Sequence, residues 1–576
     1  MAAEDAAAAE AARINLKIDT SDFASTNALG QGTQINQPKI SIEQIVYNLA
    51  LGQTTVVAGQ LAASGIDSVD VHPLVVASGI VAAAKHVRRT LGPAARTARV
   101  RGVHGGDLEV FDARGVTTVF HPEDARERLG AGMIQDLVQK VSTEASDGGA
   151  TAVVLAHAMV LASIRELSAG MPAAQVASSL QAAVVRAREL LGQIAVPAQS
   201  EEQLRAVVFT ATKDALISDM LAHVWKRAGS LDAVLLEENS GTDCSLELSD
   251  GMSFPWGLSS GRFMTSGERG QAILDDAALL IIDDWTPSLN ELLPYIERLF
   301  PTKRPLLLIA DHIPDDVLSM LIVNVERGNF PSAAVKAPGS EQESRSRLQD
   351  IAIATGGQVV TVGSDSGVYG EDLDRFFGRV RRAVVTATST VLIGTGGEGQ
   401  QVTHRAQEIR SAMDRLSSED DRARLRERLA RLEGGAAVLK IGGFTKRETE
   451  HRIGLAEKGL AVSRAAAERG LLPGGGAGLM QLSSVAESCL NHGERDSPGW
   501  RILFAAFSAP AQQLCENSGQ APSLEELESK ASIGQCFDLV AHRYGDVAAG
   551  VADSAHVVET ALSAAVDTTI RFLDLL

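Results

Sequence analysis

The chain has 576 residues, which is room for about three or four domains at ~150 residues each. Its 45% hydrophobic and 22% charged residues are ordinary for a soluble globular protein, and its net charge of −19 argues against nucleic acid and anionic membranes as partners, because both repel an acidic protein. Aromatic residues make up only 4%, so base-stacking platforms for single-stranded nucleic acid are not expected either.

Cysteine usage and the start of the chain bear on the compartment. The four cysteines show no CxxC spacing and no disulfide density, which fits a reducing cytosol. The stretch MAAEDAAAAEAAR carries acidic residues where a signal peptide has basic ones. No run approaches the ~20 apolar residues of a membrane span. The expected class is therefore a cytoplasmic, soluble, multidomain protein.

Residues 1 to 70 differ from the rest of the chain. The stretch STNALGQGTQINQPKI is rich in Gly, Asn, Gln and Thr and is typical of a linker, and ISIEQIVYNLA predicts one short amphipathic helix. We treat this segment as an N-terminal extension of unknown purpose.

A regular helical pattern begins at Leu74. The run LVVASGIVAAAKHVRRTL predicts a helix that stops at Gly92-Pro93, and RLGAGMIQDLVQKVSTEAS predicts a second. The stretch SDGGATAVVLAHAMV then places an acid, two glycines and a threonine ahead of a third helix. Two interpretations of its Asp147 stay open here. One is a helix cap, and the other is a phosphate and metal site made of a carboxylate, a glycine turn and free backbone N–H groups.

The centre of the chain, from about 250 to 400, changes character. Apolar runs typical of buried strands, AALLIIDD and PLLLIA, alternate with the helical stretches SLNELLPYIERLF and DDVLSMLIVNVERG. Two apolar stripes then predict a helical hairpin with a turn at Ser-Ser-Glu-Asp: Ile409, Met413 and Leu416, followed by Leu425, Leu429 and Leu432. Ala-rich helices return after this hairpin. The pattern predicts a helical domain split by a central α/β insertion.

Several segments, in chain order, carry a family resemblance: TLGPAARTARV, EDARERLGAGMIQDLVQKVSTEASDGGATAVVLAHAM, PLLLIA with AAVKAPG and LQDIAIATGGQVV, RLEGGAAVLKIGG, and SRAAAERGLLPGGGAGL. They resemble the Thr-Leu-Gly-Pro loop, the Asp-Gly-Thr-Thr-Thr motif, the apical domain, the intermediate domain and the Gly-Gly-Gly turn of the group I chaperonins, the GroEL-type heat-shock proteins. Each motif is weak alone. Their common order from about residue 70 to the C-terminus carries the resemblance.

The resemblance implies a multidomain α and α/β fold: a mainly helical equatorial ATP-binding domain made from both ends of the chain, a small intermediate domain and an inserted α/β apical client-binding domain. After the extension of residues 1–70, the implied limits are 71–193 and 469–576 (equatorial), 194–249 and 436–468 (intermediate), and 250–435 (apical). It also implies ATP and Mg²⁺ as cofactors, unfolded protein clients, a homo-oligomeric ring and a co-chaperonin lid.

The nucleotide site of the family can be carried over residue by residue. Asp147 matches the Mg²⁺ ligand, and Gly475 lies in the glycine turn (474–476) near base and ribose. Asp553 matches an acid on the ribose, with a surface turn as the plainer alternative. The full cofactor-binding set implied is Thr90, Leu91, Gly92, Pro93, Asp147, Gly148, Gly149, Ala150, Thr151, Gly475, Asp538 and Asp553.

This chain departs from the family at the reacting groups. Gly149 and Ala150 replace two phosphate-facing threonines. Arg114 stands where the family has an acid near the γ-phosphate, and Lys458 stands where it has the acid that orients the attacking water. Protonated Lys and Arg cannot accept a proton, and losing such a group typically costs ~10²–10⁴-fold in rate. We therefore predict very slow or absent ATP hydrolysis. Either the two cations replace the metal or clamp the phosphates, or the pocket is simply decayed.

The resemblance also places a client-binding groove on an extended segment and two helices of the apical domain. Its apolar residues in this chain are Leu258, Phe263, Leu293, Ile296, Leu318, Ile322 and Val323. Arg262 replaces a family aromatic residue, a change expected to shift selectivity. Apolar residues at helical spacing are ordinarily core, so that alternative stays open. The C-terminal DTTIRFLDLL resembles the last strand of the family.

Three functions fit these observations. The first is a divergent chaperonin that binds unfolded protein in an oligomeric ring. The second is a chaperonin-derived scaffold that binds a partner without a folding cycle. The third is a non-hydrolysing subunit that co-assembles with a normal chaperonin. The changed acids favour the second and third, and the apolar groove favours the first and third.

Overall fold

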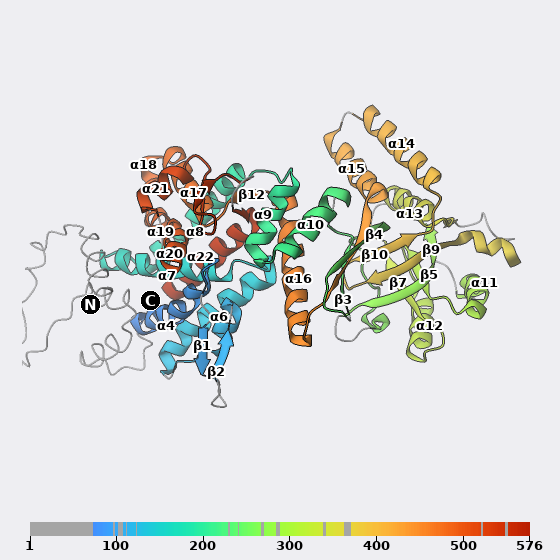
Figure 1. The fold of residues 1–576 in the computed structure, drawn as a ribbon, viewed down its shortest axis with the longest axis horizontal. Coiled ribbons are helices and arrows are strands. Elements are labelled where there is room, and N and C mark those ends of the chain that lie inside the picture. The colour runs from blue at the N-terminus through green and yellow to red at the C-terminus, as the bar shows by residue number, and fades with distance from the viewer. Residues whose placement is uncertain are drawn as a thin grey trace, which may run out of the picture.

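The computed structural model describes residues 73–576 except for these short stretches: 96–97, 102–106, 111, 123, 229–230, 240, 266–269, 284–288, 338–340, 362–369, 417, 520–521 and 548–550. The expected linker and short helix within residues 1–70 lie outside the described residues. The protein is elongated, with a helical body at one end and a large sheet with its covering helices at the other (Figure 1). Helix α16 (Lys446–Arg469) lies between the two (Figure 1).

The helical body joins early and late parts of the chain around one core. Helices before residue 195 and after residue 470 contribute to this core, and α7 packs against α22 at its centre. Its larger helices are α4 (Pro73–Val87), α6 (Ala125–Ala145), α7 (Gly149–Ser168), α8 (Ala173–Ile194), α17 (Ala477–Cys489), α19 (Pro498–Phe507) and α22 (Ala555–Leu573). Its smaller elements are η2 (Arg88–Thr90), β1 (Ala98–Arg101), β2 (Asp107–Val110), α5 (Ala113–Val119), β12 (Leu471–Pro473), α18 (His492–Arg495), α20 (Ala509–Ser518), α21 (Leu524–Ala531), β13 (Cys536–Asp538), β14 (Arg543–Gly545) and β15 (Ala552–Ser554).

Two glycines bring α4 and α6 into backbone contact. A Cβ atom at Gly79 would lie 2.1 Å from the carbonyl oxygen of Glu127, and one at Gly130 would lie 2.1 Å from the carbonyl oxygen of Val76. Both distances are far shorter than van der Waals contact, and the nearest atoms belong to the backbone. A larger side chain at either position would therefore push the two helices apart.

The C-terminal segment is helical, which corrects the strand expected for DTTIRFLDLL. Helix α22 continues to Leu573. The hydroxyls of Thr568 and Thr569 donate to the carbonyl oxygens of Ala564 and Ala565, at 3.0 and 2.8 Å, which are bonds across one helical turn. Because one face of this segment is buried in the core at helical spacing, packing outweighs the strand preference of its β-branched residues.

Helix α7 is long and apolar enough to cross a membrane by length and composition alone, although no uninterrupted apolar run marks it in the sequence. In the structure, 56% of its apolar window is buried inside the protein. Val153, Leu155 and Met159 belong to the core of the helical body. These contacts are those of a core helix of a folded domain.

A smaller core links the helical body to the sheet. Its elements are α9 (Glu201–Thr212), α10 (Ala215–Ala228), α16, β3 (Val234–Glu238) and β11 (Gly435–Ile441). Helix α9 begins with a capping box, in which the Ser200 hydroxyl accepts from the Gln203 N–H and the Gln203 side chain accepts from the Ser200 N–H. This core fixes the end of α9 relative to α16, and both carry residues of the cleft described below.

The rest of the described chain is built on a nine-stranded sheet in the order β3-β11-β4-β10-β9-β5-β6-β7, with β8 beside β5. Its further strands are β4 (Ser245–Phe254), β5 (Ala272–Asp283), β6 (Leu306–Ala310), β7 (Ser332–Lys336), β8 (Val360–Thr361), β9 (Phe377–Val385) and β10 (Thr390–Thr395). The elements that cover or connect it are η3 (Gly261–Phe263), α11 (Leu289–Leu299), η4 (Phe300–Thr302), α12 (Asp315–Glu326), α13 (Glu341–Thr355) and η5 (Gly370–Phe376). Strands β5, β6 and β7 are parallel, with α11 and α12 between them in the chain, as expected for an α/β insertion.

Strand β4 changes partner halfway along its length. Its residues 245–250 pair with β11, and its residues 251–254 pair with β10. A Cβ atom at Gly251 would lie 2.4 Å from both the Ala436 Cβ and the Leu392 carbonyl oxygen, so only glycine fits where the two partner strands meet.

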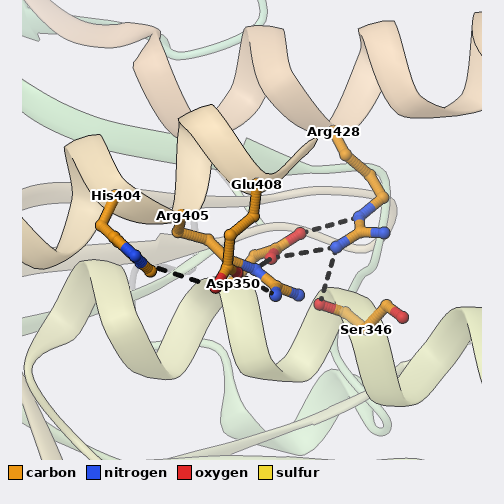
Figure 2. Close-up of polar contacts among 6 residues, drawn as sticks. All are labelled: Ser346, Asp350, His404, Arg405, Glu408 and Arg428. Carbon is orange, nitrogen blue, oxygen red and sulfur yellow. Dashed lines mark hydrogen bonds and ion pairs between the residues drawn. The ribbon is translucent and has the colours of Figure 1, made fainter. Parts of the chain in front are cut away.

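The predicted helical hairpin is present as α14 (Gly399–Arg415) and α15 (Glu419–Glu433), and Ser418 caps α15 through a bond from the Asp421 N–H. Figure 2 shows how this hairpin is held against α13. The Asp350 carboxylate of α13 is 3% exposed and accepts from the Nε atoms of Arg405 and Arg428, both at 2.8 Å. Since the three charges are largely buried, they depend on one another.

Replacing Asp350 with alanine is expected to destabilise the sheet domain by about 3–5 kcal/mol, because it leaves two guanidinium groups of Arg405 and Arg428 without their buried partner. Calorimetry of the full chain should show one thermal transition at lower temperature. The matched control is Glu408→Ala, which removes an exposed partner of Arg405 and should cost less than about 1 kcal/mol. An equal loss of stability in the two variants would contradict the buried ion-pair role of Asp350.

Candidate functional site

A cleft of about 1540 Å³ opens between the helical body, the end of α9 and the middle of α16. Every residue of the cofactor-binding set implied by the sequence lines it: Thr90, Leu91, Gly92, Pro93, Asp147, Gly148, Gly149, Ala150, Thr151, Gly475, Asp538 and Asp553. Arg114 and Lys458 line the same cleft. The fold therefore brings together segments that are hundreds of positions apart in the chain.

The Asp147-Gly148 turn is not an ordinary helix cap. The N-cap of α7 is Gly148, at φ 90°, and no side chain caps the helix. A side chain at Gly148 would be strained at this φ and would meet the Val557 side chain at 2.8 Å. The helix-cap interpretation of Asp147 is therefore wrong. The first N–H groups of α7 stay available at the cleft, where a helix N-terminus favours an anion.

The carboxylate of Asp147 is paired with a cation from α16. Its Oδ1 lies 2.8 Å from Nζ of Lys458, and both side chains are about 30% exposed, at 29% and 30%. The same ammonium donates to the carbonyl oxygen of Ala211 at 2.7 Å. Lys458 is therefore held by two acceptors between α9 and the loop before α7.

Lys213 is another cation of the cleft, and the sequence analysis does not predict it. It follows α9 in a left-handed conformation at φ 58°, and its Nζ donates to the carbonyl oxygen of Gly92 at 2.6 Å. Burial and the neighbouring Lys458 charge lower the pKa of Lys213, while Asp147 acts in the opposite direction. No motif marks this residue, because its place depends on where α9 ends.

Arg114 lies exposed on the first turn of α5. The Asp112 carboxylate, also at the cleft, accepts from the Gly115 N–H at 2.8 Å and so caps this helix. The acid nearest to Arg114 in the chain is therefore engaged in holding α5.

The opposite wall of the cleft is the glycine turn between β12 and α17. Gly475 and Gly476 have φ values of 65° and 82°, which favour glycine, and Gly474 N–H donates to the Val551 carbonyl oxygen at 2.8 Å. Asp553 belongs to β15 and pairs with Leu472 in the adjacent strand, so it is not the surface turn acid of the plainer interpretation. Asp538, further along this wall, accepts from the N–H groups that follow it.

Burial, together with the nearby Asp147 carboxylate, raises the pKa of Asp553 to about 7, although a bond from the Gly475 N–H acts against this shift. Between its ordinary 3.8 and about 7, the folded protein therefore binds a proton that the unfolded chain has released. This group makes the protein less stable as the pH rises through that window and has no further effect above it.

Asp553→Asn keeps the acceptor for Gly475 but cannot ionise. We expect its Tm to match that of the wild type near pH 4, to exceed it increasingly up to about pH 7, and to exceed it by a constant amount above. Thermal unfolding of both proteins across this range measures the difference. A Tm difference that does not change with pH would contradict the raised pKa of Asp553.

The predicted client-binding residues do not form one exposed groove. Phe263, Ile296 and Ile322 are buried in the core of the sheet domain, at 0%, 9% and 5% exposure, so for them the core alternative holds and the groove expectation is wrong. Ile296 lies on the buried face of α11 and Ile322 on that of α12, because these helices must cover the apolar sheet. Leu293 and Val323 are exposed, at 41% and 39%.

Two partly buried apolar residues and Arg262 complete the predicted client-binding set. Leu258 and Leu318 are partly buried against the same core. Arg262 forms a two-point ion pair with Glu326 at the end of α12, with Nε and Nη2 at 2.8 and 2.9 Å from the carboxylate oxygens. A charged pair thus stands where the resemblance implies an aromatic side chain, and it makes the surface at the end of α12 more polar.

Comparison with known proteins gives the family. The family model described as the TCP-1/cpn60 chaperonin family matches residues 83–249 and 289–575. Two crystal structures of the chaperonin gp146 from the bacteriophage EL 2 (Pseudomonas aeruginosa), both in the presence of ATP-BeFx, have the same fold, with TM-scores of 0.63 and 0.58. The sequence of each is 18% identical to this chain, and the matched region covers 87% of this chain and 96% of the phage protein. The family match spans well over half of the sequence, and the chain belongs to the TCP-1/cpn60 chaperonin family.

Proposed function

We propose that this protein is a divergent chaperonin that binds unfolded or partly folded proteins in an oligomeric ring, and that its cleft binds nucleotide with little or no hydrolysis. The observation that carries the second part is the contact of the Lys458 ammonium with the Asp147 carboxylate. The domain limits given by the resemblance stay a prediction.

The chemistry of the cleft supports slow turnover. Hydrolysis of a phosphoanhydride needs an acceptor that positions the attacking water near the γ-phosphate. Lys458 and Arg114 stand at the two places where the family has such acids, and neither side chain can accept. The Asp147 carboxylate is paired with Lys458, and the Asp112 carboxylate caps α5. Both of these carboxylates are therefore engaged within the protein.

The exposed apolar side chains of α11, η4 and α12 support client binding, on a smaller surface than the predicted groove. Leu293 on α11 and Val323 on α12 expose apolar side chains, and Phe300 in the adjoining η4 turn is 54% exposed. Apolar contact is non-directional, so a few such residues can hold different unfolded segments. The Arg262–Glu326 pair limits this surface at one side.

The test combines ATP turnover with a holding assay on the full chain. We expect steady-state turnover with Mg²⁺ near the background without protein, and suppression of aggregation of a denatured client without ATP. Leu293→Ser with Val323→Ser should remove this suppression, whereas Leu248→Ser, at an equally exposed position on β4, should keep it. Ordinary chaperonin turnover, or aggregation that is unaffected by the protein, would count against the respective half of the proposal.

The burial of Phe263, Ile296 and Ile322 favours a second candidate, a scaffold that binds one partner without a folding cycle. A non-hydrolysing subunit within a mixed ring is the third. Electron microscopy of the purified protein separates them, because the proposed function requires rings of this chain alone. Failure to hold denatured clients, together with tight binding of a single partner, would favour the scaffold.

A further inference from the structure

Several positively charged side chains line the cleft near Asp147, where the resemblance implies a metal ion. Lys458 lies 2.8 Å from Asp147 Oδ1, and Lys213 is close enough to both for their charges to shift its pKa. Arg114 lines the cleft as well. Within the part of the chain that the structure describes, no group of three His, Cys, Asp or Glu side chains is arranged to hold a metal.

The residues present do not fit Mg²⁺ at Asp147. This ion is bound in nucleotide sites through one or two carboxylates and the phosphates. Here the Asp147 carboxylate already accepts from an ammonium, which is fixed by a second bond to the Ala211 carbonyl oxygen at 2.7 Å. The Asp553 carboxylate on the opposite wall is bonded to the Gly475 N–H. A divalent cation on Asp147 would lie beside the positive charges of Lys458 and Lys213, and like charges at such distances repel.

We propose that the cleft binds the polyphosphate group of a nucleotide without a divalent cation, with Lys458, Lys213 and Arg114 supplying the positive charge. This inference rests on the proposed nucleotide binding and deepens it. The uncapped N-terminus of α7 adds backbone N–H donors on the same wall. Ammonium and guanidinium groups form charge-assisted bonds with phosphate oxygens, so the charge that a metal would supply is already present in the protein.

The same arrangement explains why Asp147 is retained. Without the Asp147 carboxylate, the positive charges of Lys458 and Lys213 would lose a nearby negative charge. Asp147 neutralises one of these charges until an anion binds, and its pairing keeps Lys458 pointed into the cleft. Asp147 is thus a positioning residue for a cation.

Isothermal titration of the full chain with ATP, in Mg²⁺ and in excess EDTA, tests the inference. We expect Kd to change by less than about threefold between the two buffers, since the protein supplies the charge. Lys458→Ala should weaken binding in EDTA by roughly tenfold or more, through loss of a charged bond to phosphate. The same variant should make binding stronger in Mg²⁺ than in EDTA, because Asp147 becomes free for the metal.

Asp147→Asn separates the two roles of the carboxylate. If it only positions Lys458, the variant binds ATP in EDTA as well as the wild type or more tightly. If it is a metal ligand, binding in Mg²⁺ weakens. The matched control is Lys140→Ala, which removes a Lys–Asp pair outside the cleft, with Asp567 at 2.6 Å, and should change neither titration.

The outcomes are distinguishable. Binding that requires Mg²⁺ overturns this inference and leaves the proposed nucleotide binding intact. No binding in either buffer overturns both. Equal binding in both buffers, with loss on Lys458→Ala, supports both.

Discussion

Replacing both Arg114 and Lys458 with aspartate is expected to raise ATP turnover by about 10²-fold over the wild type, measured with Mg²⁺ at steady state. The wild-type cleft supplies cations at both positions, and Lys458 also occupies the Asp147 carboxylate. The double variant restores two acceptors and frees Asp147. The effect is expected from the pair, because residues that act together in one step are not additive.

The matched control is the double variant with asparagine at both positions, which removes the same cations without supplying acids. Its turnover should stay close to the wild-type level, even if nucleotide affinity changes. An equal gain in both double variants would mean that the cations inhibit, rather than that acids are missing. If the wild type itself turns over ATP, Asp112 is the acid to replace next, because its carboxylate also lines the cleft.

Gly79→Ala is expected to destabilise the helical body by about 3 kcal/mol, since the added Cβ would lie 2.1 Å from the carbonyl oxygen of Glu127. Gly130→Ala should do the same through the carbonyl oxygen of Val76. Both contacts are with backbone, so no side-chain rotation relieves them, and α4 must move away from α6. Calorimetry of the full chain should show a clear drop in the Tm of one transition.

Gly132→Ala provides the control on the same helix. A Cβ atom there meets nothing within 4 Å, so the substitution should stabilise α6 by up to about 1 kcal/mol through helix propensity. The same chemical change thus has opposite expected signs two residues apart. Stabilisation by Gly130→Ala as well would show that the two helices are not in close contact.

The sequence predicts the features that depend on local pattern. The helices at α4, α6 and α7, the buried strands β5 and β6, and the hairpin of α14 and α15 all follow from periodicity, apolar runs and caps. The cleft-lining residues are those that the family resemblance implies. The pairing of Lys458 with Asp147 does not, because it depends on how α16 lies against the loop before α7.

Two further misses have a common cause. The spacing of Ile296 and Ile322 is that of any amphipathic helix, so it cannot show whether the apolar face covers a sheet or faces solvent. The C-terminal strand is implied by the family resemblance, whereas packing against the core makes this segment the end of α22. In each case the deciding contact comes from a segment distant in the chain.

The change of partner strand along β4 affects how the two ends of the sheet are connected. In the described sheet, β4 joins the edge near α16 to the edge near α12. The first part of β4 is hydrogen-bonded to β11 and the second part to β10. A twisting load applied at α11 and α12 would pass along the sheet towards α16, which lines the cleft, through the backbone around Gly251, where there is no room for a side chain. The close packing of that short stretch therefore opposes rotation of one end of the sheet relative to the other.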